Sequence, residues 1–167
     1  MNTETRIWKS GDRWFAAEAT DEGIVRLDWS RTKTKLLSNF HPGQNGRSSI
    51  AQKHLELAQK EVTDYVDGKL KKFTVKVAPT GTPWFVKVWN EMARIPFGKS
   101  VTYGDLAKST GKPKAPRAIG QACGRNPIPI IIPCHRVLAS NGKLGGFGYG
   151  LDEKRWLLKH EGIGWKE

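Results

Sequence analysis

The sequence of 167 residues has only two cysteines, Cys123 and Cys134, and no apolar run that approaches the length of a membrane span. Its first ten residues, MNTETRIWKS, are polar and lack the apolar core of a secretory signal. We therefore expect a cytoplasmic protein, or a nuclear one if the source is eukaryotic. A reducing compartment disfavours disulfides, so a bond between Cys123 and Cys134 is the less favoured state of these two thiols.

Motifs for bound metals and nucleotides are also lacking. The two cysteines and four histidines show none of the short paired spacings of a zinc site. The glycines of GGFGYG precede neither a Lys-Ser/Thr pair nor a helix of the dinucleotide-binding kind, so they do not indicate a phosphate loop. We expect neither a metal nor a cofactor.

Acidic residues are scarce in one part of the chain. The net charge is +12, and between residues 92 and 151 a single acid, Asp105, stands against nine basic residues: Arg94, Lys99, Lys108, Lys112, Lys114, Arg117, Arg125, Arg136 and Lys143. Such a block attracts polyanions and makes binding weaken as salt rises. Charge alone leaves two interpretations open, a nucleic-acid-binding surface and the generic surface of a basic protein.

The first half of the chain predicts a small α/β unit. TRIWKS, RWFAAEA and GIVRLDW are short segments rich in β-branched and aromatic residues, separated by turn signals, which predicts an antiparallel meander. The polar, Gly-rich residues 31–47 predict a loop, and apolar residues at helical spacing predict a helix over 48–67. KFTVKV, residues 72–77, predicts one more strand before a linker.

The second half predicts mainly helices. Thr82 and Pro83 are a good start for a helix that ends before residue 96, and Thr102 and Asp105 stand at capping-box spacing. Pro116 opens the next helix, and two short helices with a Gly/Pro connection are typical of a helix-turn-helix, although also of other helical hairpins. We expect Asp152 to cap a last helix. The change of character near residues 78–82 predicts two domains, 1–80 and 81–167.

One of the two cysteines has unusual neighbours. Cys134 follows the apolar run 128–132 and Pro133, which we interpret as the end of a buried strand, and His135 and Arg136 come directly after it. A thiol becomes nucleophilic as a thiolate, and adjacent histidine or arginine lowers its pKa. From these residues alone, an inert buried cysteine beside a surface histidine is the simpler interpretation. A thiol close to a pair of basic helices could also take an alkyl group from an altered DNA base. Such a base is stacked inside the duplex, so it must first leave the duplex to react.

Four segments resemble the O6-alkylguanine-DNA alkyltransferases: PFGKSVTYGDLA, PRAIGQACGRNPIPIIIPCHRV, GGFGYG and WLLKHEG, in register from about Thr82 to Gly162. The resemblance implies an α+β fold, with a small N-terminal α/β support domain built on an RNase H-like antiparallel sheet. A mainly helical C-terminal domain with a winged-helix-like helix-turn-helix would bind duplex DNA and transfer alkyl groups. The implied reaction moves the alkyl group of O6-alkylguanine irreversibly to a protein cysteine, and the sequence leaves open whether O4-alkylthymine is also a substrate. No protein partner, membrane, cofactor or metal is implied.

The resemblance also implies roles for individual residues. Cys134 matches the alkyl acceptor, His135 the base that takes its proton through a water, and Glu161 the carboxylate that orients the histidine. Asn126 matches the asparagine that braces the active-site turn, and Tyr103 the tyrosine whose hydroxyl contacts the extruded guanine.

DNA contacts and pocket walls are implied in the same way. Arg117 matches the arginine that fills the space left by the flipped base, on a helix whose small residues approach the minor groove closely. The implied DNA-binding residues are Thr102, Pro116, Arg117, Ala118, Gly120 and Arg125. The implied pocket residues are Tyr103, Pro129, Val137, Phe147, Gly148 and Tyr149.

The chain departs from the family pattern at the pocket. Phe147 stands where many members have tyrosine, Gly148 replaces a frequent serine, and Tyr149 stands where some members have glycine. We expect the Tyr149 ring to hinder benzyl-sized substituents. Cys123 is interpreted as a small packing residue of the recognition helix and not as a second acceptor.

Two other functions remain as alternatives. A module that binds alkylated bases without removing them would not need Cys134, and relatives of that kind lack it. A thiol hydrolase built on a Cys–His pair would need an oxyanion hole and would turn over. Strict one-to-one stoichiometry would exclude the hydrolase.

Overall fold

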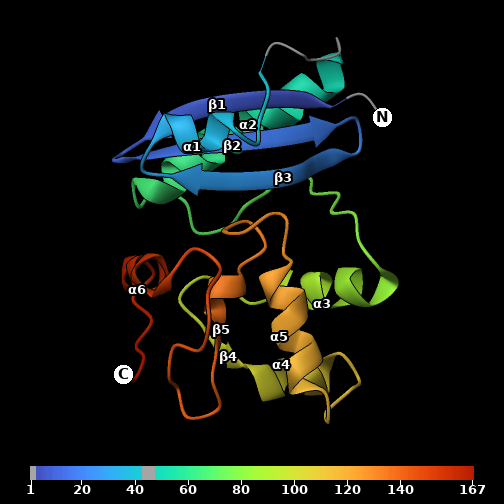
Figure 1. The fold of residues 1–167 in the computed structure, drawn as a ribbon, viewed down its shortest axis with the longest axis vertical. Helices are drawn as coiled ribbons and strands as arrows, with labels where there is room; N and C mark the ends of the chain where they lie inside the picture. Colours follow the sequence, from blue (N-terminus) through green and yellow to red (C-terminus); the bar gives the residue numbers. More distant parts are fainter. Residues whose placement is uncertain (1–2, 43–47) are drawn as a thin grey trace. The chain divides into compact units, whose positions relative to one another are not determined.

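The structure is a computed structural model that describes residues 3–42 and 48–167. The chain divides into two compact units, Met1–Thr80 and Gly81–Glu167, each with its own secondary structure (Figure 1). The first unit combines a sheet with helices and the second is mainly helical, so the predicted α+β fold is confirmed. Within the two described ranges, no helix is long and apolar enough to cross a membrane.

The first unit contains a three-stranded antiparallel meander, as predicted. β1 (Glu4–Ser10), β2 (Arg13–Thr20) and β3 (Gly23–Ser30) pair in the order β1-β2-β3. The turn between β1 and β2 uses Gly11, whose φ of 61° is a left-handed conformation that glycine adopts without steric cost.

Two helices cover the opposite faces of this sheet (Figure 1). α1 (Lys33–Leu37) contributes the buried Leu36 to an apolar cluster with Ala16 of β2 and Phe40. α2 (Ser49–Val66) lies on the other face, where Ser10 Oγ is 2.7 Å from Thr63 Oγ1. Successive side chains of a strand point to opposite faces of the sheet, so alternate residues of each strand face α1 and α2.

The prediction of a loop over residues 31–47 is wrong for its first part. α1 forms there, because Leu36 is 2 % exposed and finds an apolar face of the sheet to pack on. Residues 43–47 of that predicted loop lie outside the described residues. The helix predicted over 48–67 is confirmed, with Ser48 Oγ accepting from the Ala51 amide at 3.1 Å as an N-cap.

The strand predicted over residues 72–77 does not form. The carboxylate of Glu61 on α2 accepts from the backbone amides of Thr74 and Val75, each at 3.0 Å. These donors are then not available to a neighbouring strand, since each backbone amide has a single proton to donate. In the described part of the chain, this segment pairs with the sheet through one isolated bridge, from Val77 to Ile24.

The second unit packs four helices around a short parallel ladder. The helices are α3 (Pro83–Ala93), α4 (Tyr103–Ser109), α5 (Pro116–Gly124) and α6 (Leu151–His160). β4 (Val101–Thr102) and β5 (Val137–Leu138) pair in parallel, and the 3₁₀ turn η1 (Cys134–Arg136) leads directly into β5. α4 and α5 are packed against each other, and the buried Trp89 of α3 donates through Nε1 to the carbonyl of Ala122 on α5 at 2.8 Å.

The helix starts predicted from local chemistry are confirmed in three places. Thr82 caps α3 by accepting from the Phe85 amide at 3.2 Å. Thr102 and Asp105 form the complete capping box of α4, with both hydrogen bonds at 3.0 Å. Pro116 occupies the first turn of α5. Each of these contacts lies within four residues, which is why the sequence predicts them.

The cap predicted for the last helix is wrong. α6 begins at Leu151, its N-cap is Gly150 with a φ of 92°, and Asp152 lies inside the first turn. Gly150 adopts the left-handed angle that lets the chain turn into the helix. The Asp152 carboxylate still stabilises the helix from there, because an acid in the first turn meets the positive end of the helix dipole.

The apolar run 128–132 is a set of buried turns and not a strand. Ile130 has a φ of 72°, which is rare for a β-branched residue and is incompatible with an extended chain. The side chain of Asn126 holds the turns from inside: its Nδ2 donates to the carbonyl of Ile132 at 2.7 Å, and its Oδ1 accepts from the Ile128 amide at 3.0 Å. Cys134 therefore lies directly after a turn that the Asn126 side chain holds in place.

Candidate active site

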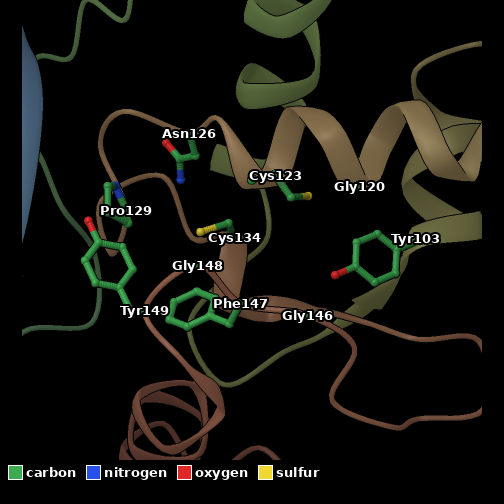
Figure 2. A pocket seen from close by; sticks show the side chains of 11 residues that line it. Tyr103, Gly120, Cys123, Asn126, Pro129, Cys134, Gly146, Phe147, Gly148 and Tyr149 are labelled. Carbon is green, nitrogen blue, oxygen red and sulfur yellow. The ribbon is translucent and has the colours of Figure 1, made fainter.

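A cavity of about 320 Å³ opens in the second unit beside Cys134 (Figure 2). Its size is that of a small-molecule pocket. α4, α5, the turns after α5, and the Gly-rich loop before α6 all contribute to its wall. The residues that line it are Tyr103, Gly120, Cys123, Gly124, Asn126, Pro129, Cys134, Gly146, Phe147, Gly148 and Tyr149. Cys134 lies between Tyr103 on one side and Pro129 with Tyr149 on the other (Figure 2).

Cys134 is a buried thiol at the first position of η1, 8 % exposed. Burial raises the pKa of this thiol, because a thiolate is poorly solvated inside the protein. The Asn126 amide, the charge of Lys154 and the backbone amides of Cys134 and His135 act in the opposite direction. The resting residue is therefore a thiol surrounded by groups that stabilise its anion once it forms.

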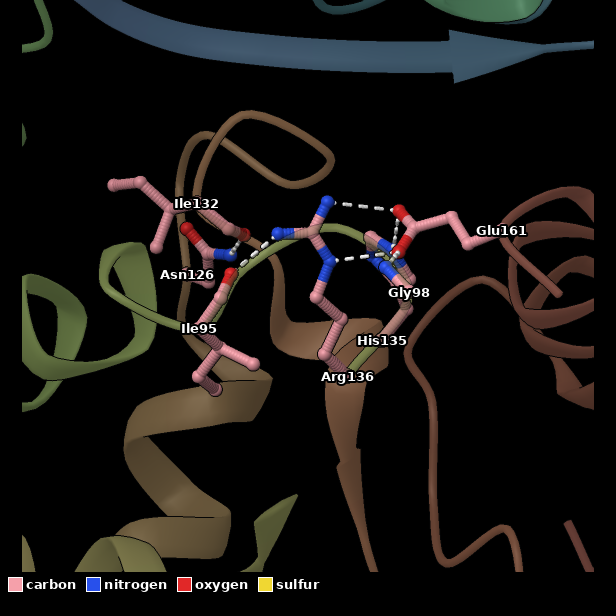
Figure 3. A network of polar contacts seen from close by, with 7 residues as sticks. All are labelled: Ile95, Gly98, Asn126, Ile132, His135, Arg136 and Glu161. Carbon is pink, nitrogen blue, oxygen red and sulfur yellow. Dashed lines mark hydrogen bonds and ion pairs between the residues drawn. The ribbon is translucent and has the colours of Figure 1, made fainter. Parts of the chain in front are cut away.

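His135 is completely buried and is hydrogen-bonded to a carboxylate that lies 26 residues further along the chain (Figure 3). Its Nε2 lies 2.7 Å from Oε1 of Glu161, the C-cap residue of α6. Its Nδ1 makes no hydrogen bond to protein atoms of the described residues. Burial lowers the pKa of His135 and outweighs the opposite influence of Glu161, so the ring is neutral and able to accept a proton.

Glu161 is held by more than His135. Arg136 donates to it twice, from Nε to Oε2 at 2.8 Å and from Nη2 to Oε1 at 2.9 Å, and the Gly98 amide donates to Oε2 at 3.2 Å (Figure 3). Burial alone would raise the pKa of this carboxyl, but the hydrogen bonds from His135 and Arg136 hold the pKa well below its usual value. Glu161 is therefore ionised.

Tyr103 is the first residue of α4, and its ring lines the cavity opposite Tyr149. Burial raises the pKa of its hydroxyl to about 12, and the nearby thiols of Cys123 and Cys134 add to this shift. The hydroxyl therefore keeps its proton at neutral pH and can donate a hydrogen bond into the cavity.

Lys154 was not singled out from the sequence, but its charge acts on the Cys134 thiol in the structure. It is completely buried, and its Nζ donates to the carbonyls of Val137 at 2.8 Å, Leu144 at 2.5 Å and Gly146 at 3.2 Å. It thereby ties the Gly-rich loop to β5, and its charge favours the thiolate of Cys134. Burial lowers the pKa of Lys154 to about 8.

A sequence signal for Lys154 did exist. It lies three and four residues before the buried Leu157 and Leu158, on the same face of α6. The run DEKR instead has the composition of a solvated helix end, and a buried lysine is rare unless it is paired. Arg136 was noted beside Cys134, but its pairing with Glu161 follows only from the fold.

We predict that Lys154→Met slows the reaction of the Cys134 thiol with a carbon electrophile by roughly tenfold or more, a loss of about 1.4 kcal/mol of transition-state stabilisation. The thiolate loses a nearby positive charge, and the loop from Leu144 to Gly148 loses its anchor. Single-turnover adduct formation, followed by peptide mass spectrometry, measures the effect. Lys159→Met, an exposed lysine on the same helix, is the control and leaves the rate unchanged. An unchanged rate in Lys154→Met would show that neither the charge nor the anchor matters.

Cys123 lines the same cavity but is held differently. Its Sγ lies 3.4 Å from the thioether sulfur of Met92, to which the thiol donates. Burial raises the pKa of Cys123 to about 12, and the neighbouring Cys134 adds to this shift. Cys123 therefore stays protonated, which agrees with its interpretation as a packing residue. Both cysteines are free thiols.

The residues expected to touch DNA lie mostly on or beside α5. Arg117 is exposed in its first turn, Arg125 is exposed at its C-cap, and Ala118 and Gly120 follow along the helix. Thr102 is engaged as the N-cap of α4.

The residues expected in the pocket are brought together with one exception. Tyr103, Pro129, Phe147, Gly148 and Tyr149 line the cavity, while Val137 lies buried in β5 with its carbonyl accepting from Lys154. The described residues contain no group of three or more His, Cys, Asp and Glu side chains that could hold a metal ion.

This arrangement suits displacement at carbon by a sulfur nucleophile. The Cys134 thiol, which can ionise, lies in the wall of the cavity, and the neutral ring of His135 lies next to it in the chain. The hydroxyl of Tyr103 is a hydrogen-bond donor on the other side of the cavity. Such a site needs only that the electrophile enter the cavity, because the protein itself supplies the nucleophile and the proton acceptor.

Comparisons with known proteins point to one family. Residues 83–163 match the family model described as 6-O-methylguanine DNA methyltransferase, DNA binding domain. The chain is 49 % identical over 141 residues to the methylated-DNA–protein-cysteine methyltransferase of Methanosarcina barkeri, which covers 84 % of this chain and 85 % of that protein.

Solved structures give the same result. The crystal structure of the Mycobacterium tuberculosis O6-methylguanine methyltransferase superposes with a TM-score of 0.77 at 31 % identity, covering 95 % of this chain and 92 % of that one. The structure of Mycobacterium tuberculosis OGT in complex with DNA has a TM-score of 0.78 at 31 % identity, with the same coverage of both chains.

Proposed function

The chain belongs to the family of methylated-DNA–protein-cysteine methyltransferases, and on this premise we propose that it repairs O6-alkylguanine in duplex DNA by moving the alkyl group to Cys134. The observation that supports this most directly is the position of Cys134, in the wall of a cavity and backed by the His135–Glu161 pair. The reaction class is alkyl transfer from a DNA base to a protein thiol, and no cofactor is needed for it.

The transfer is a single displacement. The Cys134 proton moves to His135, the thiolate attacks the alkyl carbon, and the bond from that carbon to O6 breaks. The electron pair stays on the guanine, which takes up a proton and leaves as an ordinary neutral base. The product on the protein is a thioether, a poor leaving group, so each molecule reacts once.

The target base has to leave the duplex to reach Cys134. A stacked guanine cannot enter a cavity whose nucleophile is 8 % exposed, so the base flips out of the helix. Arg117 occupies the space that it leaves, from the exposed first turn of α5. The small Ala118 and Gly120 let this helix approach the minor groove closely, and Thr102, Pro116 and Arg125 contact the backbone beside it. The partner is double-stranded DNA.

The remaining site residues position the two reactants. Glu161 orients His135, and Asn126 braces the turn that carries Cys134. The Tyr103 hydroxyl donates to the extruded guanine and stabilises the charge that develops on it as the alkyl bond breaks.

The walls of the cavity hold the base and its substituent. Pro129, Phe147 and Tyr149 supply apolar contacts, and the amide of Gly148 donates to O6. Val137 lies outside the cavity wall and its carbonyl accepts from Lys154, so we assign it no contact with the guanine. Residues 81–167 carry DNA binding and transfer, and residues 1–80 support them. O4-alkylthymine, which has a smaller ring, is included as a second substrate.

Mass spectrometry after incubation with an equimolar duplex that carries one O6-methylguanine tests the function. We expect a gain of one methylene on the Cys134 peptide that saturates at one per protein, and a parallel duplex with O4-methylthymine tests the pyrimidine. Binding of the lesion without any mass gain would indicate a recognition module. Turnover of an ester or peptide would indicate a thiol hydrolase, and an adduct on Cys123 would refute the assigned acceptor.

Tyr149 is predicted to limit the size of the alkyl group. Its ring lies 5.7 Å from that of Phe147 at the wall of the cavity, and together they narrow the space beside Cys134. We expect Tyr149→Gly to react with free O6-benzylguanine at least about tenfold faster than the wild type, by relief of a clash worth about 1.4 kcal/mol or more. The decrease of unreacted Cys134 with time, measured for each protein, gives the two rates.

The control for this prediction is the methyl substrate. A methyl group does not reach the Tyr149 ring, so both proteins should repair O6-methylguanine in duplex DNA at similar rates. Fast reaction of the wild type with O6-benzylguanine would show that Tyr149 leaves room for the larger group.

A further inference from the structure

Arg136 makes a rigid set of contacts behind the active site (Figure 3). Its Nε and Nη2 donate to the two oxygens of Glu161 at 2.8 and 2.9 Å, and its Nη1 donates to the carbonyl of Ile95 at 2.5 Å. Arg136 is 5 % exposed and Glu161 6 %. A two-pronged arginine–carboxylate pair fixes the plane of the carboxylate as well as its position.

These contacts determine which nitrogen of His135 carries the proton. Oε1 of Glu161 already accepts from Arg136, and Oε2 accepts from Arg136 and Gly98, so the carboxylate is an acceptor on every side. An ionised carboxylate has no proton to donate, so Nε2 of His135 must be the donor in their 2.7 Å contact. In the neutral ring Nδ1 is then the basic atom.

The charges around His135 sum to one positive charge. Glu161 is negative, Arg136 and Lys154 are positive, and the thiol of Cys134 is neutral at rest. Burial lowers the pKa of His135; Glu161 opposes this shift, while Arg136 and Lys154 add to it. A buried carboxylate without the arginine would raise the pKa of the imidazole, because the positive charge bonded to the carboxylate would be gone.

We propose that Arg136 is a positioning residue that neutralises Glu161 while holding it against His135, and so keeps the Cys134–His135 pair uncharged in the resting protein. This inference rests on the proposed function, in which Cys134 reacts once. If Cys134 reacts with another electrophile, the protein can no longer repair DNA. A thiolate that forms only when the alkylated guanine is bound therefore preserves Cys134 for its one reaction. Orientation and charge thus come from two partners: Glu161 orients the ring, and Arg136 limits its basicity.

The proton balance gives the expected effect of removing the charge. Ionisation moves one proton from Sγ of Cys134 to Nδ1 of His135 and creates a thiolate and an imidazolium. Arg136 repels the imidazolium. Arg136→Gln therefore favours the ion pair, whereas Arg136→Lys retains the charge and should behave more like the wild type.

Histidine ring spectra of the ¹⁵N-labelled full chain, without DNA, test the first consequence. We expect the wild-type ring of His135, assigned with His135→Gln, to be neutral at pH 7 with its proton on Nε2. In Arg136→Gln it should titrate at a higher pH, and in Arg136→Lys near the wild-type pH. An unchanged or lower titration in Arg136→Gln would overturn the proposal.

Labelling with iodoacetamide tests the second consequence, with Cys123 as an internal control. We expect Arg136→Gln to label Cys134 about tenfold faster than the wild type at pH 7, with Cys123 unchanged. Equal acceleration at both cysteines would show a loosened cavity and refute the role in charge. Arg155→Gln, which removes a partly exposed arginine paired with Asp152 and Glu167, should leave both rates unchanged.

The proposal can be refuted even if Arg136→Gln does not fold. The wild-type spectrum alone refutes the proposal if His135 is charged at pH 7 or carries its proton on Nδ1. Neither measurement uses DNA, so a failure here is separate from a failure of the proposed function, which would appear as the absence of a methyl adduct on wild-type Cys134.

Discussion

Cys134→Ser is expected to abolish alkyl transfer while the protein still binds DNA that carries the lesion. Serine keeps the shape of the side chain, but its hydroxyl does not ionise in this site, so the nucleophile is lost. We expect the rate of adduct formation to fall by at least about 10³-fold, below detection in most assays. Intact-mass spectrometry with an O6-methylguanine duplex measures the transfer, and a gel-shift titration measures binding.

The matched control is Cys123→Ser, which removes the other thiol of the same cavity. Cys123 stays protonated because burial raises its pKa to about 12, so its loss should leave the stoichiometry at one methyl group per protein. Transfer that survives in Cys134→Ser and disappears in Cys123→Ser would reverse the assignment of the acceptor.

Glu161→Gln is expected to damage both stability and reaction. The amide leaves the buried Arg136 without its counter-charge, and breaking a buried ion pair from one side costs about 3–5 kcal/mol of folding free energy. It also replaces a carboxylate that can only accept with an amide whose NH2 group can donate to Nε2, so the tautomer of His135 is no longer fixed and we expect the transfer rate to fall by roughly 10²–10⁴-fold. Urea denaturation and single-turnover kinetics measure the two effects.

The pH dependence of stability gives a second check on Glu161. Its pKa in the folded protein lies below that in the unfolded chain, so the folded state binds fewer protons and the ion pair stabilises the protein above about pH 4.5. This stabilisation is lost as the pH falls towards the pKa of the folded state. The difference between wild type and Glu161→Gln should therefore be full at pH 7 and shrink in acid.

Glu167→Gln is the control for this prediction. It removes an exposed carboxylate that pairs with Arg155, so solvent already screens its charge and the free energy of unfolding should not change measurably. If Glu161→Gln were equally harmless at pH 7, the buried pair would not contribute to the stability of the folded state.

Local chemistry explains what could be predicted from the sequence. The caps at Thr82 and Thr102 and the proline at the start of α5 involve partners a few residues apart, and all three are confirmed. The antiparallel meander follows in the same way from alternation and turn residues. Pro-Cys-His-Arg is a contiguous segment, so the sequence also indicated Cys134 as the candidate nucleophile.

Long-range pairing explains what could not be predicted. The run 128–132 has the composition of a strand, but the Asn126 side chain binds both of its ends and turns it, and the carboxylate of Glu61 does the same to residues 74 and 75. In both places a polar side chain takes the backbone groups that a sheet would have used. Propensity does not record such competition, because it depends on which side chains the fold brings close.

The sequence by itself therefore determined the family resemblance, the helix starts, the basic block and the candidate nucleophile, since each depends on residues that are neighbours in the chain. Only the tertiary structure decided that Arg136 donates hydrogen bonds to Glu161, 25 residues away in the chain, and that Lys154 is buried and donates to three carbonyls. A buried charge is tolerated only where the fold supplies its partners. Those partners come from separate elements, and they become neighbours when α6 packs against the turn that carries Cys134.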